Sequence, residues 1–134
     1  MRGLKIPSRC IVGGSVRGEV LYSDSPISFL QGVDPDKGWV SDRKHEIFRE
    51  SFSGKILVFP NSVGSSVGAY VIYRLKKNGK APKGIVNQSA DIITASGCAI
   101  SGIPLYDLPK NPLSDLRDSK RISLNEKKSE MSMI

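Results

Sequence analysis

The sequence predicts a compact α/β domain with considerable antiparallel or barrel-like β content. Short apolar runs are separated by turn residues, and the chain contains 13 glycines and 8 prolines. Between two of these runs lies one clearly amphipathic segment, which is typical of a helix packed on a sheet. The length of 134 residues is that of one domain, so we expect residues 1–134 to form a single domain.

The first 53 residues predict short strands and turns. GEVLYSDSPISFL (18–30) is expected to form two strands separated by a Ser-Asp-Ser-Pro turn. GVDPDKGWV (32–40) predicts a second turn, followed by a short strand near Trp39. Residues 41–53 are polar without a convincing period, and a short helical turn around 45–49 is the regular element expected there.

The central segment predicts a strand, a turn, a helix and a second strand. KILVFP (55–60) and GIVN (84–87) are short apolar runs, typical of strands buried on both faces. The helix is expected within SVGAYVIYRLKKNGK (66–80), because apolar residues recur at i, i+4 and i+8 from Val67. Ser66 could cap its start and Gly79 its end. Such a unit is right-handed by default.

The C-terminal third predicts a helix, a strand and a hairpin. ADIITASGCAISGIPLYDL (90–108) is expected to form a helix and then a short strand at IPLYD. RISLN (121–125) and SEMSMI (129–134) flank a polar turn and predict a closing β-hairpin.

Composition excludes several functional classes. The two cysteines, Cys10 and Cys98, lack C-x-x-C spacing and His45 is the only histidine, so we expect neither a disulfide framework nor a metal site. The net charge of +7 fits an acidic partner or a phosphorylated substrate. Nucleic-acid binding is not expected, since no aromatic residues are interleaved with an arginine-rich run. Without a long apolar stretch or a signal-peptide pattern, we expect a cytoplasmic protein that does not bind membranes.

The turn NSVGSSVG (61–68) carries more hydroxyl groups than helix capping requires. One interpretation is structural, because Ser and Gly are common in turns. A second is a nucleophile elbow, since GSSVG matches G-x-S-x-G. It is rejected because His45 precedes the turn and the chain is about half the usual length of such a fold. The third is an anion or oxyanion site, because a Gly-rich turn at a helix N-terminus presents unpaired N–H groups.

Three segments resemble the aconitase X swivel domain family, which in archaea supplies the small subunit of phosphomevalonate dehydratase. They are PISFLQGVDPDKGWV (26–40), GKILVFPNSVGSSVGAYVIYRLKKNGKAPKGIVN (54–87) and SADIITASGCAISGIPLYD (89–107). The resemblance covers residues 17–108, whereas residues 109–134 match only as a terminal β-hairpin region. It implies a swivelling β/β/α domain with a barrel-like β core and flanking helices, like the mobile domain of aconitases.

The resemblance also implies an enzymatic function. The chain would be the small subunit of a hydro-lyase that dehydrates (R)-5-phosphomevalonate to trans-anhydromevalonate 5-phosphate in the archaeal-type mevalonate pathway of isoprenoid biosynthesis. It would form a heterodimer with a large subunit that carries a 4Fe-4S cluster. This chain would bind no cofactor, since two distant cysteines cannot supply the three or four cluster ligands, and it would be inactive alone.

For the site, the resemblance places the proton-accepting serine in a G-S-S turn, which here is Gly64-Ser65-Ser66. Ser65 is therefore the expected base and Ser62 the second candidate. Gly64, Ser66 and Asn61 are expected to contact the substrate. Aconitases have an arginine where this chain has Val67, so either a cation comes from the large subunit or the charge on the base is stabilised less than in aconitases.

Two alternatives remain open on the sequence. The chain could belong to another aconitase X type dehydratase, acting on a hydroxy acid or a hydroxyproline. It could also be a non-catalytic basic binding module.

Overall fold

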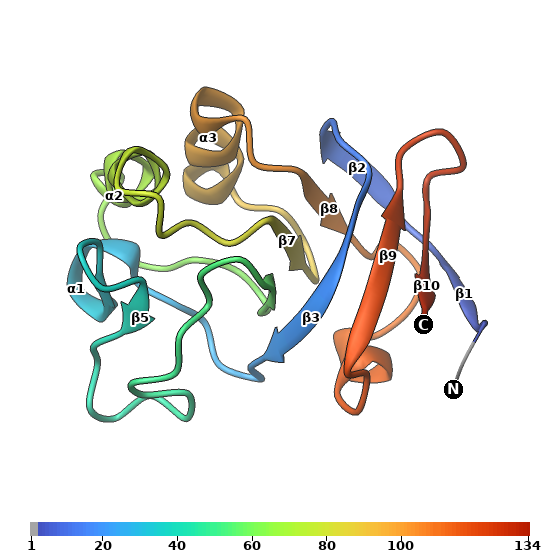
Figure 1. Cartoon of the computed structure of the whole chain (residues 1–134), viewed down its shortest axis with the longest axis horizontal. Coiled ribbons are helices and arrows are strands. Elements are labelled where there is room, and N and C mark those ends of the chain that lie inside the picture. The colour runs from blue at the N-terminus through green and yellow to red at the C-terminus, as the bar shows by residue number, and fades with distance from the viewer. Residues whose placement is uncertain (1–2) are drawn as a thin grey trace.

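An eight-stranded sheet organises the computed structural model, which describes residues 3–134 (Figure 1). Along the sheet the strands follow the order β1-β10-β9-β3-β6-β7-β8-β2. Their bounds are β1 Lys5–Pro7, β2 Arg9–Val12, β3 Val16–Tyr22, β6 Ile56–Val58, β7 Gly84–Asn87, β8 Leu105–Asp107, β9 Arg121–Asn125 and β10 Glu130–Met133. Strands β4 Val33–Asp34 and β5 Trp39–Val40 form a separate pair. The helices are α1 Phe29–Gly32, α2 Gly68–Lys77, α3 Ile92–Ser101 and the 3₁₀ helix η1 Leu113–Leu116.

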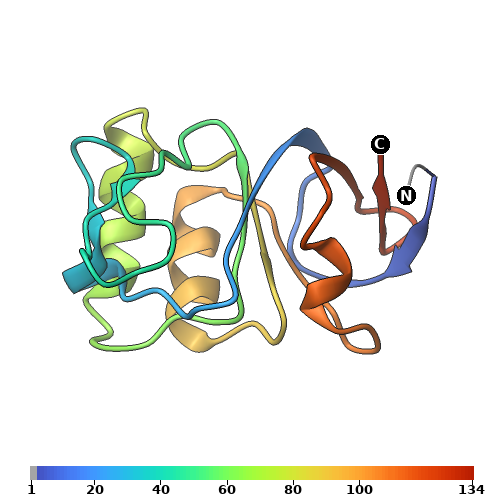
Figure 2. The same cartoon turned by 90° about the horizontal axis from the view of Figure 1, so that it is seen from below.

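The sheet curls into a nearly closed barrel. Strands β1 and β2 lie at opposite edges of the sheet, yet only Ser8 separates them in the sequence. The two edges must therefore lie close together, since one residue spans only a few ångströms. Figure 2 shows the curled strands on one side of the molecule and helices α2 and α3 on the other. The predicted barrel-like β core with flanking helices is confirmed.

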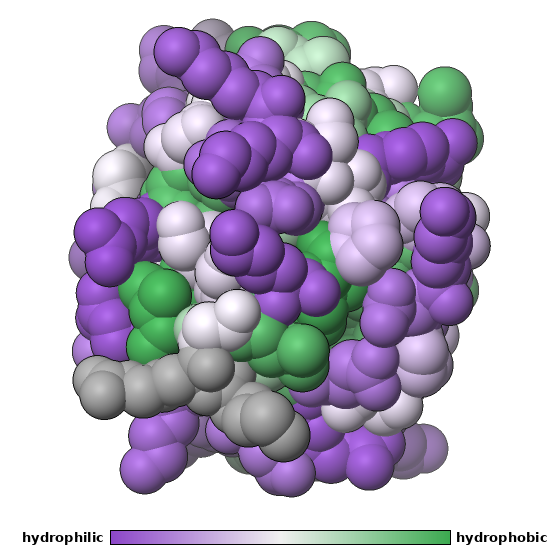
Figure 3. Space-filling model, turned by 90° about the vertical axis from the view of Figure 1, so that its right-hand side faces the viewer, coloured by the Kyte–Doolittle hydropathy of each residue, from purple (hydrophilic) through white to green (hydrophobic). Residues whose placement is uncertain are grey.

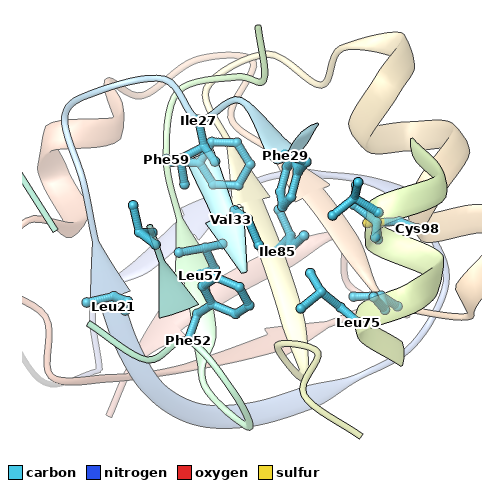
Figure 4. Packing of buried hydrophobic residues seen from close by; sticks show 14 of the residues in the cluster. Leu21, Ile27, Phe29, Val33, Phe52, Leu57, Phe59, Leu75, Ile85 and Cys98 are labelled. Atoms are coloured by element: carbon cyan, nitrogen blue, oxygen red, sulfur yellow. The ribbon is translucent and has the colours of Figure 1, made fainter. Parts of the chain in front are cut away.

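The central strands bury both faces because successive side chains point to opposite sides. In β6, Ile56 and Val58 pack in the cluster enclosed by the curled sheet, whereas Leu57 packs in the cluster beneath the helices. In β7, Val86 and Ile85 divide in the same way. Figure 4 shows the helix-side cluster, where side chains from the sheet meet side chains from the helices. This alternation produces a β/β/α layering.

The predicted strand–turn–helix–strand unit is confirmed, because β6 and β7 are parallel and α2 connects them. Val71, Ile72 and Leu75 form the buried face of α2, and Gly79 follows the helix with φ +69°. The predicted serine cap is wrong. Val67 occupies the N-cap position and no side chain caps α2. The turn instead pairs the first amides of the helix with its own carbonyl groups.

Two predictions for the first 53 residues also need correction. The expected second strand within residues 18–30 is reduced to a bridge between Ile27 and Ser62, after which the chain enters α1. Ser28 caps that helix, and Phe29 packs edge-on against Phe59 with ring centroids 5.8 Å apart. Residues 45–49 form turns and a bridge to β5 instead of a helical turn.

The remaining predicted elements are present. Helix α3 and strand β8 follow β7, and β9 pairs with β10 as the closing hairpin. Helices α2 and α3 pack closely at Gly97. A Cβ atom at this position would lie 2.8 Å from Cβ of Ile72 and 3.2 Å from the carbonyl oxygen of Ala69.

We expect Gly97→Ala to lower the free energy of unfolding by about 1–3 kcal/mol, because the added methyl group overpacks this contact. The sign is informative, since Gly→Ala within a helix would otherwise stabilise it by up to about 1 kcal/mol. Urea denaturation measures the change. Ala99→Gly at an exposed position of α3 is the control and should show only the propensity loss. A stabilised Gly97→Ala variant would contradict the close packing.

Candidate functional site

The serine turn lies at the edge of the sheet where the parallel strands end. Strands β3, β6, β7 and β8 are mutually parallel, so their carboxyl ends share one edge. The turn follows β6, and a second loop, residues 88–91, follows β7. In α/β sheets this edge is the usual place for a ligand site.

Ser62 is buried and bound to the loop that follows β7. Its hydroxyl donates a short hydrogen bond to Oδ1 of Asp91, and its amide donates to Oδ2 at 2.7 Å. Asp91 is also the N-cap of α3, where it accepts from the Thr94 amide and the Thr94 hydroxyl, each at 2.9 Å. We call this set, Ser62, Asp91 and Thr94, the latch. It fixes the start of the serine turn to the start of α3.

The latch keeps the Asp91 side chain ionised. Partial burial by itself would raise the pKa of Asp91, but the hydrogen bonds from Ser62 and Thr94 outweigh it and lower the pKa below the ordinary value. A carboxylate in this state is a weak base. It also disfavours a second negative charge on the Ser62 oxygen beside it.

Ser65 is in a different environment. It is exposed, and its Oγ accepts a hydrogen bond from the Val67 amide at 3.1 Å. Its carbonyl group accepts from the Gly68 amide at 2.9 Å, so the first amides of α2 are already paired. Within residues 3–134, the hydroxyl hydrogen of Ser65 has no acceptor.

The unpaired donors belong to the turn itself. The amides of Gly64, Ser65 and Ser66 have no partner in the part of the chain that the structure describes. Gly64 has φ +90°, a conformation that favours glycine, and a Cβ there would lie 3.0 Å from Oγ of Ser28. Consecutive free amides around a left-handed residue can bind an anion. The free donors therefore lie in the Gly-rich turn around Gly64 and Ser66, as expected, whereas the first amides of α2, which were also expected to be free, are paired.

The predicted site residues other than Ser62 lie in two different environments. Gly64, Ser65 and Ser66 lie together on the exposed turn. Asn61 is half-buried, and its side-chain amide donates to the Ser62 carbonyl at 2.9 Å. Asn61 thus supports the turn.

The sequence reasoning missed an ion pair next to the latch. Arg9 donates two hydrogen bonds to the buried Asp107, from Nε at 2.9 Å and from Nη2 at 2.6 Å. Asp107 also accepts from the Ala90 amide at 2.9 Å. Burial would raise the pKa of Asp107, but these bonds lower it. The ion pair could not be predicted, because no local sequence pattern indicates the register in which β2 pairs with β8. The N-cap role of Asp91 could have been predicted, since Asp91 and Thr94 match an N-cap pattern.

The cysteines and the histidine do not form a metal site. Cys10 is half-buried. Cys98 is buried, and its burial together with the Asp91 charge raises the pKa of Cys98 to about 12. His45 Nε2 lies 2.9 Å from the carbonyl oxygen of Pro26. Across residues 3–134, no three His, Cys, Asp or Glu side chains are grouped to hold a metal ion. These residues do not fit an iron–sulfur cluster, which needs cysteine thiolates. The same residues include no helix of the length and apolarity needed to span a membrane.

Comparison with known proteins gives consistent matches over nearly the whole chain. The model of the aconitase X swivel domain family matches residues 5–133. The phosphomevalonate dehydratase small subunit of Thermococcus gammatolerans is 44% identical over 131 residues, covering 98% of each chain. That of Methanosarcina acetivorans is 47% identical over 123 residues, covering 91% of this chain and 85% of the relative. A chain in the crystal structure of Thermococcus kodakaraensis aconitase X (holo-form) is 44% identical with a TM-score of 0.88, covering 98% of this chain and 99% of that one.

The latch predicts different stability effects for the two candidate serines. We expect Ser62→Ala to lower the free energy of unfolding at pH 7 by about 1.5–3 kcal/mol, because it removes a hydrogen bond to a charged group. Ser65→Ala, the matched control, should change it by about 0.5 kcal/mol or less, since this hydroxyl is exposed. Chemical denaturation measures both. If both variants lost the same free energy of unfolding, the latch would be contradicted.

The Ser62→Ala effect should depend on pH. Because the pKa of Asp91 is lowered in the folded protein, the latch stabilises the fold above the ordinary carboxyl pKa of 3.8 and loses that contribution as pH falls through the lower folded value. The difference between the variant and the parent should therefore shrink below pH 3.8. A difference that is constant from pH 7 to pH 3 would contradict this origin.

Proposed function

The chain belongs to the aconitase X swivel domain family, and on that premise we propose that it is the small subunit of a phosphomevalonate dehydratase. The observation that carries the proposal is the match along nearly the full length of both chains with relatives of that name. The serine turn at the carboxyl edge of the sheet supports the proposal chemically, because it offers a hydroxyl group for proton transfer and free amides for anion binding. The reaction would be the dehydration of (R)-5-phosphomevalonate to trans-anhydromevalonate 5-phosphate, as a cytoplasmic step of isoprenoid biosynthesis.

Ser65 is the proton acceptor in this proposal. The base must take a proton from the carbon next to the substrate carboxylate while hydroxide leaves the adjacent carbon, so that a double bond forms. The Ser65 oxygen accepts the Val67 amide hydrogen bond, which would stabilise its alkoxide. Because the hydroxyl hydrogen has no acceptor within residues 3–134, that proton would first pass to solvent or to a group of the large subunit. The Ser62 hydroxyl is bound to a carboxylate, which argues against its ionisation. This contrast favours Ser65.

The free amides of the turn would bind the substrate. A negative oxygen of the substrate could accept hydrogen bonds from the amides of Gly64 and Ser66, which are exposed residues. Asn61 would act indirectly, by holding the Ser62 carbonyl. The net charge of +7 would favour the approach of a phosphorylated, carboxylate-bearing substrate.

The proposed site needs a second subunit. The residues of this chain do not fit a 4Fe-4S cluster, so we assign the cluster to the large subunit of a heterodimer. The same subunit would supply the cation that Val67 does not. The substrate site would then form between the subunits.

The function is tested by co-expressing this chain with the large subunit of the same organism under anaerobic conditions. We expect the purified complex to dehydrate phosphomevalonate, and this chain alone to be colourless and inactive. Related hydroxy acids and hydroxyproline serve as control substrates. Turnover of one of these without turnover of phosphomevalonate would move the chain to another dehydratase of the family. Cluster absorbance from this chain alone would contradict the proposed division between the subunits.

Ser65→Ala should lower kcat about 10²–10⁴-fold, the usual contribution of a positioned base. KM and complex formation should change little, because the hydroxyl acts mainly in the transition state. Ser66→Ala is the matched control on the adjacent hydroxyl and should have a smaller effect. Steady-state kinetics of the assembled enzyme measure kcat and KM, and size-exclusion chromatography of the two subunits measures complex formation. If Ser62→Ala abolished turnover while Ser65→Ala retained it, the base would be Ser62.

A further inference from the structure

We propose that the exposed apolar face around the serine turn is the surface that docks the large subunit, and this inference rests on the proposed function. The apolar face is defined by six residues, namely Leu30, Val63, Val67, Tyr70, Ile92 and Ile100. They come from α1, the serine turn, α2 and the two ends of α3.

Large apolar side chains are concentrated on this face. Tyr70 is 60% exposed, Ile100 68% and Ile92 79%. Of the nine large hydrophobic residues that are exposed in residues 3–134, six belong to the apolar face. Exposed isoleucine at both ends of a packed helix is unfavourable for an isolated subunit, and a concentration of exposed apolar side chains marks interaction sites.

The elements of the face are in direct contact. A Cβ placed on Gly68 would lie 3.2 Å from Cγ2 of Ile93, 3.3 Å from Cβ of Phe29 and 3.8 Å from the Leu30 amide nitrogen. The starts of α1, α2 and α3 therefore meet next to the serine turn. Farther along, Ser66, Ala69, Tyr70, Tyr73 and Ile100 line an apolar groove of about 440 Å³. This groove begins at the turn that carries the proposed base.

Charge indicates the chemistry of the partner. Neither α2 nor α3 contains an acidic residue, and Arg74 near the end of α2 is paired with Asp36. The Lys77 ammonium lies 5.9 Å from the ring centroid of Tyr73, which lines the groove. A matching surface would have an apolar ridge for the groove and a carboxylate facing Lys77. Because the apolar face adjoins the turn that needs groups from the large subunit, one subunit could cover the face and complete the site.

The opposite end of the molecule differs. Figure 3 shows the right-hand side of Figure 1, the side on which β1 and β10 lie, where many hydrophilic side chains surround smaller apolar areas. Leu4 is exposed next to β1, with 44% of its surface accessible. This residue provides a matched control for substitutions on the apolar face.

The test measures binding of the purified large subunit to Ile100→Glu and Tyr70→Glu by isothermal titration calorimetry under anaerobic conditions, with Leu4→Glu as the control. We expect each face variant to raise Kd about 100-fold or more, because a carboxylate would be buried in an apolar interface without a partner. Leu4→Glu should bind like the parent. Thermal unfolding of each free variant should match the parent, since all three side chains are exposed.

The outcomes separate this inference from the proposed function. If the parent chain does not bind the large subunit, the proposed function fails. If the parent and both face variants bind the large subunit equally well, the apolar face is not the interface, but the proposed function is unaffected. If only Leu4→Glu weakens binding, the interface is at the opposite end. If the parent self-associates through this face, as judged by light scattering, and Ile100→Glu makes it monomeric, the face is occupied by a second copy and the inference is wrong.

Discussion

Asp91 is the group on which the geometry of the candidate site depends. It joins the turn after β6 to the start of α3 through hydrogen bonds from Ser62 and Thr94. The preceding residue, Ala90, is held by Asp107, and Asp107 is held by Arg9. A continuous set of polar contacts thus crosses the carboxyl edge from β2 to the serine turn. Carboxylates at such a position are stable only when fully hydrogen-bonded, so each member constrains its neighbours.

This arrangement divides the serine turn into a fixed part and a free part. At Ser62 the hydroxyl and the amide are both used by Asp91. Two residues later, at Gly64, the chain takes a left-handed conformation, and the next amides are unpaired within the described residues. The latch orders the turn without using the groups that could contact a ligand. Such support beneath a functional group is what precise positioning requires.

The sequence predicted most of the elements that build the site but few of the contacts between them. Periodicity identified α2 and the strands on either side of it, because this pattern is local. Closure of the barrel was only a broad expectation, since it depends on pairings such as β1 with β10 that join the two ends of the chain. At Ile27 and Phe29 the alternation was taken for a strand, although Ser28 caps a short helix there. The Ser62–Asp91 bond spans 29 residues and has no local signature.

The exposure of Ser65 gives a physical reason for a two-subunit enzyme. In water, an amide hydrogen bond stabilises an alkoxide only weakly, because the solvent screens it and competes for it. Covering the turn with a second protein would remove that solvent and strengthen the contact with the Val67 amide. The apolar face beside the turn is a surface that could bind this second protein tightly. On this proposal docking and catalysis are coupled, because the interactions that seal the interface would also raise the fraction of Ser65 present as the alkoxide.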